Sequence, residues 1–504
     1  MGLKILASKG GAGSSPAAGT SGRPFCGAPE GSRTPRVYTL PRLRLTRASD
    51  QPGPGHLPVD HQHNGKQVKY WRAPWGPGET CWTSFAKLPL VLDSDGSPWA
   101  PACLWLFELA RSKPLGISSL TPVAQDLAAY KAYLDELALE WADFSAVDKY
   151  IRPTYLYCTR LRNQINDREL APSTAKRRMS TVIRFYRFLL TDSRLGFEPA
   201  NAPWVERGAA IRYLDSKGFR QVAEVVTTDV SIKIPRRQDA WEGTMDDGGK
   251  LRPLSMEEQK VLIVTLKQLD NIEYSLMHWV ALLSGARAMT VLTLRVRDFE
   301  RPPEEIAQWP HKLRCGPGTG IDTKRDVSGV YLVICSELYN MLHTYTVSAR
   351  ARARRSKSML GEDALNYVFL TRQGQPYYES KEDRNAVRHS STPLRRSALT
   401  GRPLRKFIES ELIPAVRRTL PNFKYSFHDL RATFGMNWVD DFTRADAMSL
   451  GSSYVWAVEQ LRKLMWHKSV QTTERYLGYR EHMRHLERAQ QGWSTHLLEL
   501  LTRS

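Results

Sequence analysis

The chain has 504 residues, and its 72 Lys and Arg against 52 Asp and Glu give a formal net charge of +20. That length corresponds to two to four domains, and the excess of positive charge is typical of proteins that bind phosphate backbones. The six cysteines include no C-x-x-C pair, and no apolar run approaches the length of a membrane span. These features argue against a disulfide scaffold, a zinc site and a membrane protein.

The N-terminal part divides into two regions. Residues 1–65 are dense in Gly, Pro, Ser and Arg and show no hydrophobic period, which predicts disorder. They are either a basic tail or translated sequence ahead of the true start. Residues 66–118 form a small N-terminal region, with a short strand near 87–92 and a helix over 102–110.

Residues 119–204 read as a helical domain with three helices, over 121–139, 148–165 and 173–190, the last capped by Ser173. The third helix has one apolar and one basic stripe. Between Lys149 and Arg194 there are eleven Lys and Arg against three acids. We expect the basic stripe to touch phosphates through Lys176, Arg177, Arg184 and Arg187.

Residues 205–250 are rich in Pro and Gly and are expected to be an interdomain linker. Residues 251–480 then form a second domain. Its expected elements are helices at 255–269, 274–284 and 336–347 and strands at 311–315 and 330–334. The tail, 481–504, has the pattern of an amphipathic helix. The fold class is therefore mainly α with a small antiparallel β-sheet.

Three short boxes in the second domain carry reactive side chains. Ser284-Gly285-Ala286-Arg287 joins two helices, and His428 and Arg431 lie three residues apart, on one helical face. His467 precedes Tyr476 by nine residues. A tyrosine hydroxyl, with a free pKa of about 10, attacks well only where cations and a proton acceptor converge on its target.

These boxes, in this order, resemble the tyrosine recombinase (phage integrase) family. The resemblance runs from about residue 251 to 479, and more weakly over 120–204. It implies a two-domain, C-shaped DNA clamp, in which 119–204 is the helical core-binding domain and 251–480 the catalytic domain. It also implies double-stranded DNA as partner, no cofactor and no metal, and a cytoplasmic, nucleoid-associated location.

The resemblance assigns a role to each reactive residue. Tyr476 becomes a 3′-phosphotyrosine, and Arg287 and Arg431 bind the non-bridging oxygens of the phosphate. His428 acts as base or phosphate ligand, and His467 donates a hydrogen bond to a phosphate oxygen. Lys324, in the turn between the two strands, protonates the departing 5′ oxygen.

Several positions depart from the family pattern or leave a choice open. Thr290 stands where the family usually carries an acid, three residues after the first arginine. Arg325 or Lys312 could take the role of the lysine, and Tyr479 is a rival nucleophile by proximity. The 36-residue gap from Arg431 to His467 is long and suggests an inserted loop over 440–453.

Two basic runs, 350–357 and 384–406, are expected to be disordered or to follow DNA as insertions. The tail either packs on its own domain or docks on a neighbouring protomer in a tetrameric synapse on DNA.

The function expected from the resemblance is site-specific DNA recombination or integration, serving a mobile element. The alternatives are a DNA-binding relative without catalysis, and a type IB topoisomerase or end-resolving enzyme that uses the same chemistry.

Overall fold

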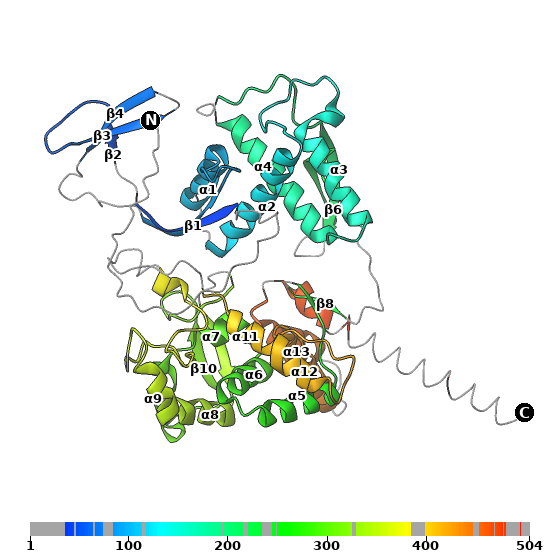
Figure 1. Ribbon diagram of the computed structural model, residues 1–504. Coiled ribbons are helices and arrows are strands. Elements are labelled where there is room, and N and C mark those ends of the chain that lie inside the picture. Colours follow the sequence, from blue (N-terminus) through cyan, green and yellow to red (C-terminus); the bar gives the residue numbers. More distant parts are fainter. Residues whose placement is uncertain are drawn as a thin grey trace, which may run out of the picture. The chain divides into compact units, whose positions relative to one another are not determined.

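The structure is a computed structural model, and it divides into two compact units (Figure 1). The first is built mainly from Met1–Arg237 and the second from Gln238–Asn385 and Leu399–Ser504. The described residues are 36–44, 47–63, 66–73, 84–112, 117–192, 196–214, 220–233, 244–247, 249–324, 329–384, 399–446, 453–467, 469–476, 478–479 and 494.

The first unit has a helical core. Its helices are α1 (Ala100–Ser112), α2 (Ile117–Glu136), α3 (Pro153–Asn166) and α4 (Pro172–Thr191), with a short 3₁₀ turn at Lys149–Ile151. Aromatic rings fill the space between them, and the Tyr130 and Tyr186 hydroxyls are hydrogen-bonded at 2.8 Å. These helices occupy the ranges that the apolar periodicity predicts.

Helix α4 has the two faces expected from its sequence. Its buried positions form one apolar stripe: Ala175, Met179, Val182, Ile183, Phe185, Tyr186 and Leu189. The four basic candidates, Lys176, Arg177, Arg184 and Arg187, are all exposed. The predicted cap was wrong: the N-cap is Ala171, because Pro172 occupies the first helical position and Ser173 lies inside the helix.

Small antiparallel sheets surround these helices. Strand β1 (Val37–Arg44) pairs with β5 (Ser84–Val91), and β4 (Lys66–Ala73) lies between β2 (Arg47–Ser49) and β3 (Leu57–His63). The expectation of disorder over 1–65 is therefore wrong for the three strands between 37 and 63; residues 1–35 lie outside the described part. Leu40, Leu43, Leu88 and Leu90 supply the buried contacts between β1 and β5, which composition alone does not reveal.

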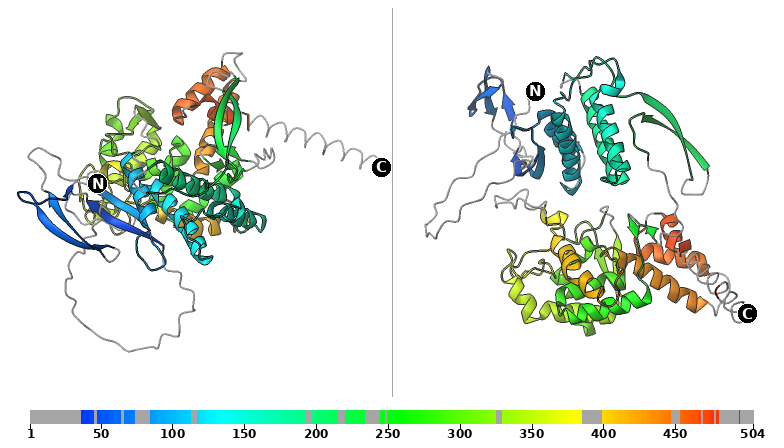
Figure 2. Two further views of the ribbon diagram at one scale, coloured as in Figure 1. Left: turned by 90° about the horizontal axis from the view of Figure 1, so that it is seen from above. Right: turned by 45° about the vertical axis from the view of Figure 1, so that its right-hand side comes forward.

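The expected linker contains a long hairpin. Strand β6 (Glu206–Leu214) pairs with β7 (Arg220–Thr228) over nine residues in each strand, a ribbon that stands out in Figure 2. Most of β7 is exposed, so its alternating residues carry little of the burial pattern that marks a strand in sequence.

The second unit is helical around a small hairpin. Its helices are α5 (Met256–Gln268), α6 (Ile272–Ser284), α7 (Ala288–Leu292), α8 (Ser336–Val347), α9 (Ala349–Arg355), α11 (Arg402–Phe407), α12 (Ile413–Val416), α13 (Asp429–Asp446) and α14 (Ser453–Leu464). Shorter turns are the 3₁₀ segments Val296–Phe299 and Pro303–Glu305 and the π segment Ile408–Leu412. Its strands are β8 (Met245–Asp246), β9 (Lys250–Leu251), β10 (His311–Cys315) and β11 (Val330–Ile334).

The prediction of a mainly α fold with small antiparallel sheets is confirmed. Strands β10 and β11 pair in antiparallel register from His311 opposite Ile334 to Cys315 opposite Val330. The N-terminus of α5 is a capping box, in which Ser255 accepts from the Glu258 amide and Glu258 accepts from the Ser255 amide. No helix among the described residues is long and apolar enough to span a membrane.

The basic run 350–357 is part of the fold rather than disordered. Arg350 and Arg354 pair with the fully buried Glu273 of α6, at 2.7 and 2.9 Å. The carboxylate of a buried glutamate needs such partners, since an unpaired buried charge is costly. Of the second run, 385–398 lies outside the described residues and Arg402–Lys406 belongs to α11.

Candidate active site

The first box is held by a helix end. Gly285 is the C-cap of α6, with a left-handed φ of 67°, a conformation that glycine adopts without strain. A Cβ here would also lie 2.6 Å from the Phe434 ring of α13. The turn places Arg287 at the N-cap of α7, half-buried.

The second box begins α13, and its uncharged and acidic residues have structural roles. Asp429 accepts from the amide and hydroxyl of Ser426 and from the Arg252 amide, at 2.8–2.9 Å. Thr433 accepts from the Leu254 amide at 2.9 Å. Asp429 and Thr433 therefore fasten residues 252–254, immediately after β9, onto α13.

Arg431 is buried at the centre of the site, with 1% of its surface exposed. Its Nε donates to Asp247 at 2.7 Å, its Nη1 to the Gly285 carbonyl at 2.7 Å, and its Nη2 to the Met465 carbonyl. A guanidinium fixed through all three nitrogens keeps one orientation, as a preorganised anion ligand requires.

The third box follows α14. Trp466 adopts a left-handed φ of 55°, and its indole donates to the Tyr331 carbonyl of β11 at 3.0 Å. This anchor turns His467 inward, where its Nδ1 lies 3.0 Å from the Thr473 hydroxyl. The expected loop over 440–453 is wrong in part, because α13 continues to Asp446 and α14 begins at Ser453.

Tyr476 is fully buried, and its ring lies against a glycine of α13. A Cβ on Gly435 would be 2.6 Å from Tyr476 Cε1 and 3.1 Å from Met465 Sδ, so this close approach needs a residue without a side chain. The rival Tyr479 is only half-buried and packs at the edge of the same apolar cluster.

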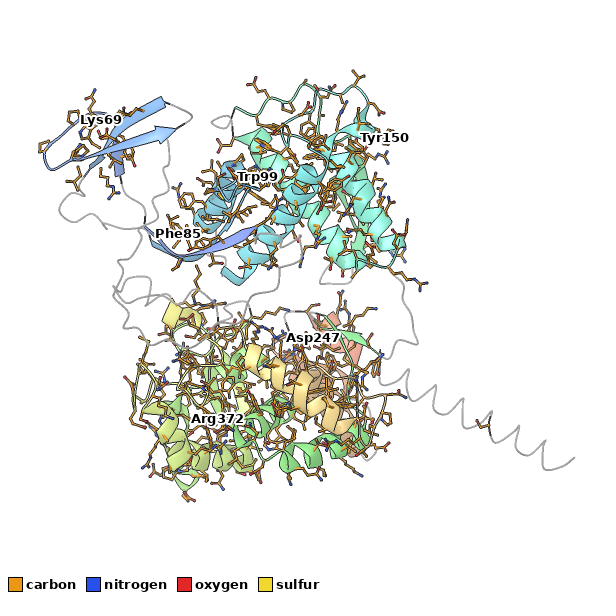
Figure 3. All side chains as sticks on the ribbon, in the orientation of Figure 1. Lys69, Phe85, Trp99, Tyr150, Asp247 and Arg372 are labelled. Atoms are coloured by element: carbon orange, nitrogen blue, oxygen red, sulfur yellow. The ribbon has the colours of Figure 1, made fainter. Side chains whose placement is uncertain are left out.

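One carboxylate, which the sequence analysis did not single out, joins these groups. Asp247 lies in the turn after β8, where Figure 3 labels it. Its Oδ2 accepts from Arg431 Nε at 2.7 Å, Tyr476 Oη at 3.1 Å and His467 Nε2 at 3.2 Å. Arg287 Nη2 lies 3.5 Å from Oδ1. The backbone of Asp247 also hydrogen-bonds to His428. The five predicted residues of the three boxes therefore gather around Asp247.

The electrostatics of the site follow from burial and this one carboxylate. Burial opposes ionisation of Asp247, but the hydrogen bond from His467 and the charge of Arg431 outweigh it and hold its pKa well below the usual range. Burial and then the charge of Asp247 raise the pKa of Tyr476 far above its usual value. In this arrangement the phenol stays protonated.

Both site histidines are held neutral. Burial, followed by repulsion from Arg431 and Arg287, lowers the pKa of His428. Burial also lowers the pKa of His467, and its hydrogen bond to Asp247 only partly opposes the effect. A neutral imidazole can accept a proton, which is what a general base requires.

The sixth predicted residue, Lys324, is exposed at the end of the described segment that follows β10. The base of this loop is fastened to α7 and its C-terminal flank: the Thr290 hydroxyl donates to the Asp322 carbonyl at 2.8 Å, and the Asp322 amide donates to Thr293 at 2.9 Å. The hydroxyl at the usually acidic position thus ties the loop to the helix that begins at Arg287. Of the rivals, Lys312 is exposed on β10 and residue 325 lies outside the described residues.

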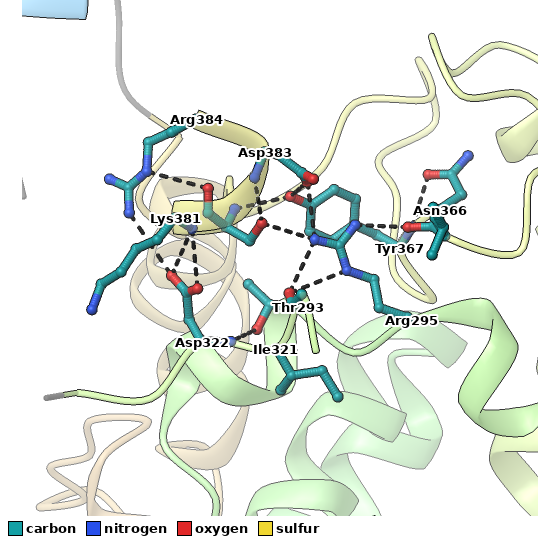
Figure 4. Close-up of polar contacts among 12 residues, drawn as sticks. Thr293, Arg295, Ile321, Asp322, Asn366, Tyr367, Lys381, Asp383 and Arg384 are labelled. Carbon is teal, nitrogen blue, oxygen red and sulfur yellow. Dashed lines mark hydrogen bonds and ion pairs between the residues drawn. The ribbon is translucent and has the colours of Figure 1, made fainter. Parts of the chain in front are cut away.

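A second polar cluster supports the same loop (Figure 4). Arg295 donates to the Gly320 carbonyl through Nε and Nη2, at 3.1 and 3.0 Å, and to Asp383 at 3.0 Å. The Asp322 carboxylate accepts from the Lys381 amide at 3.0 Å. Residues 320–322 are therefore held from both sides.

The candidate phosphate contacts of the first unit differ in their surroundings. Arg177 makes two hydrogen bonds to the buried Asp126, at 2.9 and 3.1 Å, which gives it a structural task. Arg184 and Arg187 stack over the Trp105 and Trp204 rings, at 5.5 and 5.8 Å. Lys176 is exposed on the same helix.

No family model and no curated protein matches the sequence. Among solved structures, the XerH site-specific recombinase bound to its difH substrate is similar with a TM-score of 0.41 and 13% identity, covering 74% of this chain and 80% of that one. The Tn1549 transposon integrase with circular intermediate DNA gives 0.41 and 13%, covering 75% and 94%. The XerA recombinase gives 0.29 and 12%, covering 76% and 96%. The structures that it resembles are recombinases and integrases, at a distance that leaves the function to be argued from the site itself.

Proposed function

We propose that the protein is a site-specific DNA recombinase or integrase that cuts and rejoins DNA through a 3′-phosphotyrosine. One observation carries the proposal: the Tyr476 hydroxyl, both arginines and His467 converge on a single anionic group in a buried site. This donor set matches a phosphodiester attacked by a phenol, in which negative charge grows on the non-bridging oxygens.

In the cleavage step, Tyr476 Oη attacks the phosphorus and the bond to the 5′ oxygen breaks. Arg287 and Arg431 bind the non-bridging oxygens and stabilise the charge of the pentacovalent transition state. Neutral His428 accepts the phenolic proton, and His467 donates through Nε2 to a phosphate oxygen.

Lys324 supplies the proton that the leaving 5′ oxygen takes up. The products are a phosphotyrosine ester on the 3′ side and a free 5′ hydroxyl. Attack by a 5′ hydroxyl from a partner strand reverses the step and releases the tyrosine. The ester conserves the energy of the broken bond, so that this chemistry calls for neither a nucleotide nor a metal.

The remaining parts of the proposal concern DNA and assembly. The exposed basic face of α4 contacts the duplex backbone through Lys176, Arg184 and Arg187, and the two units close on DNA as a clamp. Exchange of strands between two duplexes needs four active sites, so the protein assembles as a tetramer on DNA. Its biological role is the integration or excision of a mobile element.

The test is covalent trapping of DNA. A library of short duplexes, nicked so that the cut fragment diffuses away, is incubated with the protein in excess EDTA without nucleotide, and the attached DNA is sequenced. Tyr476→Phe should lose the adduct and keep its DNA affinity. Tyr479→Phe and Tyr367→Phe, the matched controls, should keep both.

Three outcomes would contradict parts of the proposal. An adduct that survives in Tyr476→Phe and is lost in Tyr479→Phe would reassign the nucleophile. A requirement for magnesium would indicate a metal-dependent nuclease. Adducts without any exchange between two duplexes would favour a topoisomerase or end-resolving enzyme.

A further inference from the structure

The Asp247 carboxylate stands in for a phosphate in this structure. Three donors meet its Oδ2 within 3.2 Å, namely Arg431 Nε, Tyr476 Oη and His467 Nε2, and Arg287 approaches Oδ1. These are the side chains that the proposed reaction directs at the scissile phosphate. Two anions cannot share these donors, because like charges at such distances repel strongly in a buried site.

We propose that Asp247 is an internal, displaceable ligand of the phosphate site, which holds the site closed until a DNA phosphodiester replaces it. The inference rests on the proposed function, since it takes the site's external ligand to be a phosphodiester. It adds a state of the protein in which every reactive group is in place and the site is occupied by the chain's own anion.

The nucleophile is inactive in this state. The Tyr476 hydroxyl donates to Asp247, so its proton points at the carboxylate, and an ionised neighbour disfavours the phenolate that must form during attack. Replacing the carboxylate with a phosphodiester exchanges this partner for the electrophile. Displacement of Asp247 thereby couples substrate binding to activation of the tyrosine.

The partners of Asp247 do not need it for their own positions. Arg431 is also fixed by the Gly285 and Met465 carbonyls, and His467 by Thr473 on its other ring nitrogen. The site thus keeps its shape when the carboxylate leaves, which distinguishes a displaceable ligand from a positioning residue.

Asp247 is also carried by an element that can move at low cost. Strands β8 and β9 have two residues each, and the Asp247 amide bonds to the Gly249 carbonyl across the turn at 3.1 Å. The flanking Met245 and Leu251 are buried in the cluster that contains Tyr476, so the base of the hairpin stays fixed. A two-stranded hairpin is marginally stable by itself, and its turn can shift without disturbing the helices.

The experiment measures anion binding to the full-length chain. Wild type, Asp247→Ala and Asp247→Asn are titrated with inorganic phosphate at constant ionic strength, and the thermal unfolding midpoint is followed, because a ligand that binds only the folded state raises it. Glu257→Gln, which removes one negative charge from an exposed position on α5, is the matched control. We expect both Asp247 variants to bind phosphate at least about tenfold more tightly than wild type, since the competing ligand is gone. The control should behave as wild type.

Trapping of nicked duplexes is measured on the same proteins. Both Asp247 variants should still form the Tyr476 adduct and should reach half-saturation at a lower DNA concentration than wild type. A variant that is unstable alone should be restored by phosphate.

Equal phosphate affinity in wild type and both variants would overturn the inference. So would folded variants that lose the adduct, since Asp247 would then be a positioning residue, and so would misfolding that phosphate does not restore. Failure of the proposed function is a separate result: wild type would form no adduct, whatever the variants do with phosphate.

Discussion

Two buried arginines of the second unit have nearly the same partners and different tasks. Arg431 pairs with Asp247 and Arg295 with Asp383, and each carboxylate also accepts from a tyrosine, Tyr476 in one case and Tyr367 in the other. Burial does not separate them, since the two arginines are 1% and 3% exposed.

The difference lies in what else meets the carboxylate. Asp247 also receives His467 and Arg287, whereas Asp383 has no histidine partner among the described residues. The Tyr367 hydroxyl donates to Asp383 and accepts from the Ser380 amide, and Arg295 stacks on its ring at 4.0 Å.

A buried Arg–Asp–Tyr set is therefore not by itself a reactive site. Arg295 spends its donors on backbone carbonyls and ties loops together. Around Asp247, the donors of four side chains face one anion, and this convergence is what catalysis of phosphoryl transfer requires. Figure 4 shows that the Arg295 cluster serves the site at one remove, by holding the loop that leads to Lys324.

The largest effect is expected at the end of that loop. Lys324→Ala should lower the rate of adduct formation by about 10²–10⁴-fold, the usual contribution of a general acid. A duplex with sulfur in place of the bridging 5′ oxygen should be cut at a near-normal rate by this variant, because a thiolate leaves without protonation. Lys312→Ala is the matched control on β10. Loss of activity in that variant instead would move the role to Lys312.

Conservative changes at the two arginines should separate chemistry from support. Arg431→Lys should lower adduct formation by about 10²–10³-fold, since an ammonium cannot bridge two oxygens. Arg295→Lys should lower the unfolding midpoint and leave the rate per folded molecule within a few-fold of wild type. Single-turnover trapping, corrected for the folded fraction, measures both. Equal losses of rate would dissolve the distinction between the two clusters.

Two glycines allow the same comparison through packing. A Cβ on Gly435 would strike the Tyr476 ring at 2.6 Å, and a Cβ on Gly320 would meet Arg295 Nε at 2.8 Å. Gly435→Ala should shift the nucleophile and lower adduct formation by about tenfold or more, because overpacking costs about 1–3 kcal/mol. Gly320→Ala, which also has a left-handed φ, should mainly reduce thermal stability. An unchanged rate in Gly435→Ala would show that the ring is free to move.

Acid pH should produce the smallest and most gradual effect. The pKa of His428 and of His467 is lowered by burial, so both stay neutral at pH 7, and protonation begins only below the usual histidine value of about 6.5. The unfolded chain binds these protons more readily, so stability present above about pH 6.5 falls as the pH drops below it. Adduct formation should decline over the same range as the base is lost.

Thermal unfolding across that range supplies the control for the pH experiment. Burial lowers the pKa of the core residue His278 to about 4, so its protonation destabilises the fold progressively from about pH 6.5 down to 4. His428→Gln should flatten the acid limb of the rate profile and leave the contribution of His278 to unfolding intact. A limb that persists in this variant would mean that unfolding, or His467, sets the decline.

The sequence alone determined the local parts of the site. Gly285 before Arg287 indicated a turn between two helices, the three-residue spacing of His428 and Arg431 put them on one face, and β10, β11 and α8 lie where the periodicity placed them. Each of these inferences depends on residues within a few positions of one another, where backbone geometry fixes what is adjacent.

Only the tertiary structure decided which distant groups meet. Asp247 and Tyr476 are 229 residues apart, and the pattern Asp-Asp-Gly-Gly signals no more than a turn. The same holds for Gly435 beneath the tyrosine ring and for Glu273, whose pairing with Arg350 turns an apparently disordered basic run into helix α9. Local propensity is set by neighbours in the chain, whereas the partner of a buried charge is set by packing, and no spacing in the sequence records it.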